Sequence, residues 1–263
     1  MNMKILLVVD ETSFYHPSFV NELIISLKEK KNDIFGGIVT KIGKKNNIEL
    51  YIRRNFHKLY LSEILVLFSK KIFFIILNKL FPYGFKNNFF SVKSVFKKHK
   101  VPFFKIENNI NTEENLQKIK NLKLDLIISS NSLYFGSGIL NLPKLGCINR
   151  HTSLLPSYGG VWPVLHAIAN DEKEVGVTVH QMTRDIDIGK VLAQKKISIT
   201  GSSKNLSDIY KKAFLVSHSV VLDAIDNLIQ NKNLKFYNYP SSYFSFPDNN
   251  DWMNFRNNGG KFV

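Results

Sequence analysis

Three side chains in the second half of the chain have the chemistry needed to move an acyl group. Asn149 and His151 lie two residues apart as the chain leaves a short apolar run, so both can project into one crevice. Asp187 lies in residues 185–189 (DIDIG), which have the composition of a tight loop ending on glycine. An amide and an imidazole can stabilise an oxyanion, and a carboxylate can orient the imidazole and manage a proton. These residue types together indicate acyl transfer.

Each of these residues also has a purely structural interpretation. An asparagine before a loop commonly satisfies a turn, and an aspartate two residues before a glycine commonly forms an Asx turn. A lone histidine is commonly a hydrogen-bonded structural residue. Spacing alone therefore does not choose between a site and a set of turns.

A longer pattern surrounds the three residues. Residues 149–160 read NRHTSLLPSYGG, and they are followed by PVLHAIAN at 163–170, GVTVHQM at 176–182 and DIDIG at 185–189. Together these strings resemble the formyltransferases that use 10-formyltetrahydrofolate, a family that includes glycinamide ribonucleotide, methionyl-tRNA and sugar N-formyltransferases. The resemblance is dense over residues 146–194 and extends in topology from residue 1 to about residue 199.

The resemblance implies roles for particular residues. The catalytic Asn, His and Asp of the family match Asn149, His151 and Asp187. Its folate-binding loop matches approximately residues 131–135, together with residues 183–187. The cofactor-binding residues expected from these matches are Ser132, Leu133, Tyr134, Arg184 and Asp185. The co-substrate would be 10-formyltetrahydrofolate, and no metal would be required.

The resemblance also implies a mechanism. A neutral amine of the acceptor would attack the formyl carbon of the folate, and Asn149 and protonated His151 would hold the tetrahedral oxyanion. Asp187 would raise the pKa of His151 and help to remove the amine proton. One departure stands out, because many members have Tyr-Arg-Gly where this chain has Tyr158-Gly159-Gly160. The function of that arginine must be absent here or supplied by a neighbour.

The elements that would position these residues follow from the apolar pattern. Short apolar runs at residues 4–9, 34–39, 101–106 and 124–129 alternate with helical spacing at 17–31, 91–100 and 113–121. Further strands are expected at 146–149, 175–182 and 191–199. Such alternation predicts an α/β fold with a doubly wound, mostly parallel sheet and a Rossmann-type core. Ligands of these sheets bind beyond the carboxyl ends of the strands.

We expect a catalytic domain over residues 1–200, with a basic and apolar insertion at about 41–100. Residues 201–263 would form a short C-terminal extension, consisting of a helix at 206–229 and an irregular aromatic tail. The single cysteine, Cys147, excludes an intramolecular disulfide and suits a reducing compartment. Five apolar residues before Asp10 are too few for the core of a signal peptide.

The charge is concentrated in one part of the chain. The 36 basic and 21 acidic residues give a net charge of +15, and residues 41–105 contain 15 basic residues against Glu49 and Glu63. Such a field favours an anionic partner, although a lysine-rich composition would produce it as well. Within this part, residues 59–81 are strongly apolar but too interrupted by lysine to span a bilayer. We favour a packed helix or an oligomer contact here, with a helix lying in a membrane surface as the alternative.

The acceptor is expected to be an amino sugar, either nucleotide-linked or lipid-linked, used in surface polysaccharide such as lipopolysaccharide. Only 64 residues follow residue 199, whereas a methionyl-tRNA enzyme would need a barrel of about a hundred. A glycinamide ribonucleotide enzyme would need a glycine-rich phosphate loop where this chain has Asp10 and Glu11. These two acceptors, water as in a 10-formyltetrahydrofolate hydrolase, and a non-enzymatic module that binds anionic surfaces remain the alternatives.

The expected location is the cytoplasm, with a peripheral contact at the inner face of the membrane through 59–81 as a further possibility. The expected partners are the folate, the amino sugar and a second copy of the chain in a homodimer, without nucleic acid. The aromatic tail, with Tyr243, Phe244, Phe246 and Trp252, would pack on the domain, close over a base or form the dimer contact.

Overall fold

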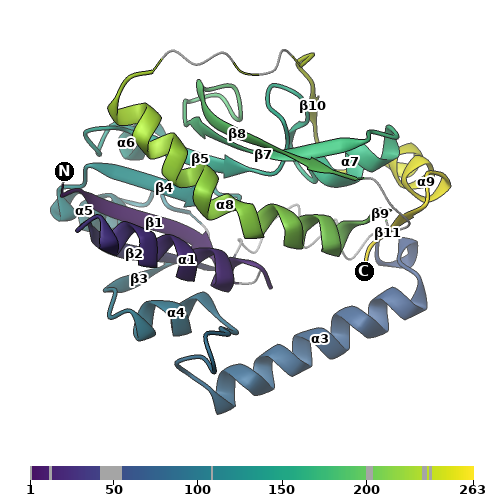
Figure 1. Cartoon of the computed structure of the whole chain (residues 1–263), viewed down its shortest axis with the longest axis horizontal. Coiled ribbons are helices and arrows are strands. Elements are labelled where there is room, and N and C mark those ends of the chain that lie inside the picture. Colours follow the sequence, from purple (N-terminus) through teal and green to yellow (C-terminus); the bar gives the residue numbers. More distant parts are fainter. Residues whose placement is uncertain are drawn as a thin grey trace.

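A seven-stranded sheet lies at the centre of the molecule, with strand order β3-β2-β1-β4-β5-β7-β8 (Figure 1). The structure is a computed structural model that describes residues 2–11, 14–41, 55–107, 109–199, 204–232, 236 and 239–263. The strands are β1 (Lys4–Asp10), β2 (Asp33–Lys41), β3 (Phe103–Glu107), β4 (Leu126–Ser130), β5 (Cys147–His151), β7 (Glu174–Gln181) and β8 (Val191–Ser198).

The sheet is mostly parallel, as the sequence predicts. Strands β1 to β5 run parallel to one another. Strand β7 pairs antiparallel with both β5 and β8. The chain steps outward from β1 to β2 and β3, and then returns to place β4 on the other side of β1. Strand order therefore reverses between β1 and β4, and this switch point is where ligands of such sheets bind.

Helices cover both faces of the sheet, which makes the fold doubly wound. Alternate residues of β1 point to opposite faces, so that Leu7 packs in one buried cluster and Leu6 and Val8 in the other. The first cluster includes residues of α1 (His16–Glu29), α4 (Val92–Lys98), α7 (Pro163–Ala169) and α8 (Leu206–Ile229). The second includes residues of α5 (Glu113–Leu122) and α6 (Ser137–Leu140).

Helix α8 spans the residues that the periodicity predicts. The Asn205 side chain accepts a hydrogen bond from the backbone N–H of Asp208, which caps its first turn. The helix lies across the sheet beside α1, and its apolar face joins the same core as the strands (Figure 1). The domain boundary expected at residue 200 falls on residues 200–203, which lie outside the described residues.

The C-terminal tail is more regular than the sequence predicts. It contains α9 (Asn249–Asn257) and two short strands, β10 (Tyr243–Phe244) and β11 (Gly260–Lys261). Strand β10 pairs with β6 (Gly159–Gly160), and β11 pairs with β9 (Lys204–Asn205). The prediction of an irregular tail was therefore wrong for these residues, because pairing with distant segments orders them.

The apolar segment at 59–81 forms α3 (Leu61–Leu80), which follows a short 3-10 turn, η1 (Phe56–Lys58). Figure 1 shows α3 at the edge of the molecule, away from the central sheet. Its inner side contacts the body, but Glu63 is its only buried residue. The expectation of a packed helix is thus met on one side only, and residues 42–54 of the expected insertion lie outside the described residues. No helix within the described ranges is both long and apolar enough to cross a membrane.

Candidate active site

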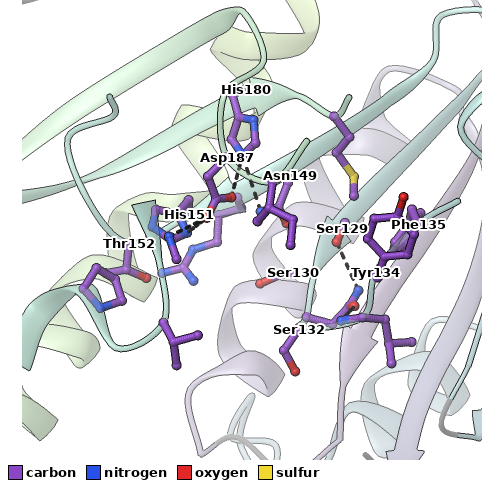
Figure 2. A pocket seen from close by; sticks show the side chains of 18 of the residues that line it. Ser129, Ser130, Ser132, Tyr134, Phe135, Asn149, His151, Thr152, His180 and Asp187 are labelled. Atoms are coloured by element: carbon purple, nitrogen blue, oxygen red, sulfur yellow. Dashed lines mark hydrogen bonds and ion pairs between the residues drawn. The ribbon is translucent and has the colours of Figure 1, made fainter. Parts of the chain in front are cut away.

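A cavity of about 490 Å³ opens at the carboxyl ends of three parallel strands. Asp10, Ser130 and His151 are the last residues of β1, β4 and β5, and all three line it. The cavity therefore lies at the switch point where the topology predicts a ligand. Figure 2 shows Asn149, His151, His180 and Asp187 on one side of this pocket and Ser129, Ser130, Ser132, Tyr134 and Phe135 on the other.

The three expected catalytic residues do converge. Asn149 and His151 come from β5, and the loop between β7 and β8 brings Asp187 to them. Asp187 Oδ2 lies 3.6 Å from His151 Nδ1, while Asp187 Oδ1 lies 3.4 Å from His180 Nε2. His180 is opposite Asn149 in the β5–β7 ladder, and Asn149 Nδ2 lies 3.5 Å from His180 Nε2. The other ring nitrogen of His151, Nε2, donates to the Tyr158 carbonyl at 3.0 Å.

The electrostatics of the pair favour an ionised carboxylate beside a neutral imidazole. Burial raises the pKa of Asp187, but the contacts of its carboxylate with His180, His151 and the Gly160 amide together lower it to about 2. Burial lowers the pKa of His151 by more than Asp187 raises it. The pKa of His151 is thus lowered overall, and Asp187 is the neighbour that favours the protonated form. The Asn149 Oδ1 atom is buried without a hydrogen-bond partner and remains available to a ligand.

Strand β6 holds Asp187 from the backbone side. The Gly160 N–H donates to Asp187 Oδ2 at 2.8 Å. Gly160 itself has a φ of +94°, and a Cβ there would overlap the Phe244 carbonyl of the paired strand β10. Only glycine fits this close approach between two backbones. The Gly159-Gly160 pair therefore helps to position the Asp187 carboxylate.

At the departure from Tyr-Arg-Gly, Gly159 packs closely against its neighbours. A Cβ at Gly159 would lie 3.3 Å from the Tyr243 ring and 3.5 Å from the Asp187 Cβ. Strand β10 pairs with this residue and places the aromatic ring where a longer side chain would begin. A side chain at position 159 would therefore begin in tight contact with Tyr243.

Four of the five expected cofactor-binding residues line the cavity. Ser132, Leu133, Tyr134 and Asp185 are among its lining residues. Asn131 fixes this loop, because its side chain donates to the Val8 carbonyl at 2.9 Å and accepts from the Leu133 N–H at 2.8 Å. Arg184 is exposed and is not one of the lining residues, so the structure does not bring it to the cavity. Consecutive residues of an exposed loop point in different directions, and the sequence pattern did not resolve which of them point inward.

The sequence reasoning missed several polar residues of the cavity wall. Arg150 follows Asn149 directly, and its guanidinium stacks 3.9 Å from the Phe214 ring centroid and donates to Ser217 Oγ at 2.9 Å. Its Nη2 atom is buried without a partner, and no described carboxylate forms an ion pair with it. Burial lowers its pKa to about 10, so it stays charged at neutral pH. A charged residue between Asn149 and His151 in a mostly buried strand was the sequence signal.

Asp10 is a second missed residue. Burial raises its pKa to about 7, and its Oδ1 atom has no partner among the described residues. Its neighbour Glu11 instead accepts a hydrogen bond from the Lys93 N–H at 3.2 Å, near the start of α4. The expected acidic pair after the first strand is therefore split, with only Asp10 in the cavity wall.

The aromatic tail divides between residues that line the cavity and residues that pack on the domain. Tyr243 and Phe246 line the cavity. Phe244 stacks on Tyr158 with ring centroids 5.2 Å apart, and Trp252 is buried against Trp162. Two of the four aromatic residues of the tail therefore pack on the domain, and the other two form part of the cavity wall.

No cluster of His, Cys, Asp and Glu that could hold a metal ion occurs in the part of the chain that the structure describes. The single thiol, Cys147, is buried and its pKa is raised to about 12 by burial. It therefore has no thiolate available for chemistry at neutral pH.

Comparisons with known proteins show which proteins the chain is similar to. The sequence profile described as formyl transferase matches residues 53–225. The methionyl-tRNA formyltransferase of Thermotoga maritima is 35% identical over 138 residues, which cover 52% of this chain and 44% of that protein. The chain thus spans less than half the length of this relative.

Solved structures share the fold at low identity. A sugar N-formyltransferase from a Shewanella species superposes with a TM-score of 0.57 and 18% identity, covering 93% of this chain and 77% of that one. A sugar 3N-formyl transferase solved in the presence of dTDP and 5-N-formyl-THF gives a TM-score of 0.55 at 17% identity, covering 94% and 70%.

Proposed function

Because this chain belongs to the formyl transferase family, we propose that it moves a formyl group from 10-formyltetrahydrofolate to the amine of an amino sugar. The observation that carries the proposal is the convergence of Asn149, His151 and Asp187 on one wall of the switch-point cavity. The amino sugar would serve surface polysaccharide synthesis. The folate would occupy the side lined by Ser132, Leu133, Tyr134 and Asp185.

The residues of the site can carry the transfer of the formyl group with all protons accounted for and without a metal ion. The lone pair of the acceptor amine forms a bond with the formyl carbon, and the carbonyl electrons move to oxygen. The neutral imidazole of His151 accepts one amine proton, and the ionised Asp187 stabilises the imidazolium that results. The Asn149 amide and this imidazolium stabilise the oxyanion. Collapse restores the carbonyl, breaks the bond from the formyl carbon to folate N10 and returns the proton to N10.

The charge of the cavity wall supports a phosphate-linked acceptor. Arg150 is a buried cation without a described carboxylate partner, and an anionic group of the substrate would compensate it. Trp162 and Tyr243 also line the cavity, and their faces suit a sugar ring or a base. An amino sugar linked to a diphosphate brings an anion and a ring into one ligand.

A second acceptor follows from the sequence relatives, because the T. maritima protein is a methionyl-tRNA formyltransferase. The methionyl group at the end of an aminoacylated tRNA would also present a neutral amine to His151. The glycinamide ribonucleotide alternative has less support, because Asp10 and Glu11 stand where a glycine-rich phosphate loop would be needed.

The test is incubation with 10-formyltetrahydrofolate and four acceptors: amino-sugar nucleotides, methionyl-tRNA, glycinamide ribonucleotide and water. Mass spectrometry should show the gain of one formyl group on an amino-sugar nucleotide, with release of tetrahydrofolate in equal amount. Formylation of methionyl-tRNA alone would replace the acceptor, and folate release without a formylated product would indicate a hydrolase. No turnover by protein that binds folate would contradict the proposed activity.

Arg150→Met tests the phosphate-linked acceptor separately. A hydrogen bond to a charged group contributes about 1.5–3 kcal/mol, so the KM for the nucleotide-linked acceptor should rise about tenfold to hundredfold. Arg184→Met is the matched control, because this arginine is exposed and does not line the cavity. Equal KM values for both variants and the wild type would remove Arg150 from the acceptor site.

A further inference from the structure

The side of α3 that faces away from the body is apolar and exposed. We call the six residues of this side the outer face of α3: Leu61, Leu65, Phe68, Ile72, Ile75 and Ile76. Their spacing of three and four residues places them on one side of the helix. Their exposed fractions range from 41% for Ile72 to 72% for Leu61. At 1.5 Å per residue the 20-residue helix is about 30 Å long, so the apolar strip is far larger than scattered surface leucines would be.

The body of the protein holds α3 by its opposite side. At its start, Arg256 binds both carboxylate oxygens of Glu63 at 2.9 and 2.6 Å. In the middle, Phe74 contacts the Phe14 ring with centroids 5.0 Å apart, and Lys70 Nζ lies 5.2 Å from the same ring centroid. Near its end, Ser91 Oγ donates to Asn78 Oδ1 at 2.8 Å. These contacts fix the rotation of the helix, and so the outer face is presented outward.

The outer face cannot be the surface of a spanning helix. Lys70, Lys71 and Lys79 lie within α3, and no described helix meets the requirements for crossing a membrane. Val66, Phe73 and Leu80 are exposed as well, so apolar side chains cover more of α3 than the outer face. Lys79 continues the outer face by the same spacing, near the end of the helix. A helix with such an exposed apolar surface and lysines among it instead suits the plane of a membrane surface, where apolar residues enter the boundary between headgroups and acyl chains. Lysine stems can extend from such a helix to the headgroups.

The charge of this part of the chain selects the occupant. From Ile64 to Ile106 the chain contains nine lysines and no acidic residue. Glu63, the acid immediately before this range, is already paired with Arg256. A second copy of this chain would bring the same positive charge toward the outer face, which opposes pairing. An anionic lipid surface has the complementary charge and also accepts the apolar side chains.

We propose that the outer face of α3 docks on an anionic lipid surface, with the helix axis in the membrane plane. Phe68 and its apolar neighbours enter the bilayer boundary, and Lys71, Lys79 and Lys86 contact lipid phosphates. All three lysines are exposed. This docking does not depend on the proposed formyl transfer, because the cavity shares no lining residue with α3.

Co-sedimentation with vesicles tests the proposal on the full chain. Wild type should sediment with vesicles of phosphatidylcholine and phosphatidylglycerol but not with phosphatidylcholine alone. A triple variant with Lys71→Gln, Lys79→Gln and Lys86→Gln should bind about a hundredfold more weakly, since each basic residue near the surface contributes about 1 kcal/mol. The matched control replaces three exposed lysines elsewhere: Lys120→Gln, Lys123→Gln and Lys232→Gln. It should bind nearly as well as wild type, because these lysines lie away from α3.

A variant of the outer face separates insertion from charge alone. Phe68→Ser and Ile72→Ser together should abolish binding to the anionic vesicles while circular dichroism stays unchanged, because both side chains are exposed. Equal loss in the control triple variant would show nonspecific attraction and overturn the proposal. Absence of vesicle binding by wild type would also overturn it. A wild-type dimer in sedimentation equilibrium that the double serine variant converts to a monomer would then identify the second copy as the occupant.

Discussion

Asp187 is the residue on which the geometry of the candidate site depends most, because it contacts two histidines and a backbone amide at once. Its carboxylate faces His151 Nδ1 and His180 Nε2, and it accepts from the Gly160 N–H. The loop between β7 and β8 brings it there with a φ of +59°, a conformation that aspartate tolerates better than most residues. The residue type expected from DIDIG is thus suited both to the chemistry and to the backbone.

Asp187→Asn should reduce formyl transfer by about two to four orders of magnitude, the usual range for losing an acid–base or oxyanion group. The amide can still accept from Gly160 but cannot stabilise an imidazolium at His151. Asp223→Asn, on the exposed surface of α8, is the matched control and should behave as wild type. Near-normal turnover by folded Asp187→Asn would exclude the proposed role.

The buried carboxyl of Asp10 should make the stability of the protein depend on pH. Its pKa rises from 3.8 to about 7 on folding because burial penalises the charged form. Between these values the folded state binds a proton that the unfolded state has lost, so the free energy of unfolding falls as pH rises from about 4 to about 7. Above the folded pKa the loss is complete.

Asp10→Asn removes this titration. Relative to wild type, the variant should gain stability progressively from pH 5 to pH 8, as measured by urea unfolding at each pH. An equal substitution at exposed Asp223 should leave the pH profile of wild type unchanged. A constant difference between Asp10→Asn and wild type across this range would show that Asp10 titrates normally.

At the scale of elements, hydrophobic periodicity predicts the helices and strands that are long enough to repeat their own pattern. The helix at 206–229 and the strands of the sheet were anticipated within a few residues, because each repeats an apolar pattern and ends at a cap or turn. Helix α9 has only nine residues, and its buried side chains are Trp252 and Phe255. Two apolar positions do not establish a period, so its existence depends on tertiary packing that the sequence pattern does not contain.

The site was predictable to a similar degree. The family resemblance located Asn149, His151 and Asp187, and the structure brings them together. The lowering of the His151 pKa was not predictable, because it depends on how deeply the ring is buried. The pairing of Gly159 with Tyr243 was not predictable either, because the two residues are separated by more than eighty positions.

The β6–β10 ladder gives a prediction with an internal control. Gly146 and Gly160 both have positive φ, but a Cβ meets nothing within 4 Å at Gly146 and overlaps the Phe244 carbonyl at Gly160. Gly146→Ala should therefore cost about 1–2 kcal/mol of stability from backbone conformation alone. Gly160→Ala should cost about 3 kcal/mol or more, because overpacking is added.

Gly160→Ala should also lower formyl transfer, because moving β6 away from β10 displaces the N–H that holds Asp187. Urea unfolding and turnover measured on both variants separate the two effects. If the two substitutions cost the same stability, β10 does not pack against Gly160 as the structure describes.

At the scale of the whole molecule, the cavity joins segments that are distant in the sequence. Its walls come from the ends of β1, β4 and β5, from the loop after β7 and from the tail at Tyr243 and Phe246. A ligand that fills it connects the first strand to the C-terminal segment. Binding should therefore stabilise the folded chain globally rather than a single loop.

Thermal unfolding with a non-reactive folate analogue measures this coupling. A ligand present at a hundred times its Kd adds about 2.7 kcal/mol to the free energy of unfolding. For a chain of this size class 1 kcal/mol corresponds to about 2–4 °C, so the Tm should rise by about 5–10 °C.

The shift should persist in the presence of a chelator, because the proposed transfer uses the imidazole, the amide and the carboxylate of the site. The Tm shift should also persist in His151→Ala, because the defect of this variant is in proton transfer. Leu133→Asp should abolish the Tm shift, because it places a charge among the residues assigned to the folate side of the cavity. A shift that disappears with chelator would require a metal in the binding step, and a shift that Leu133→Asp leaves intact would place the folate elsewhere on the protein.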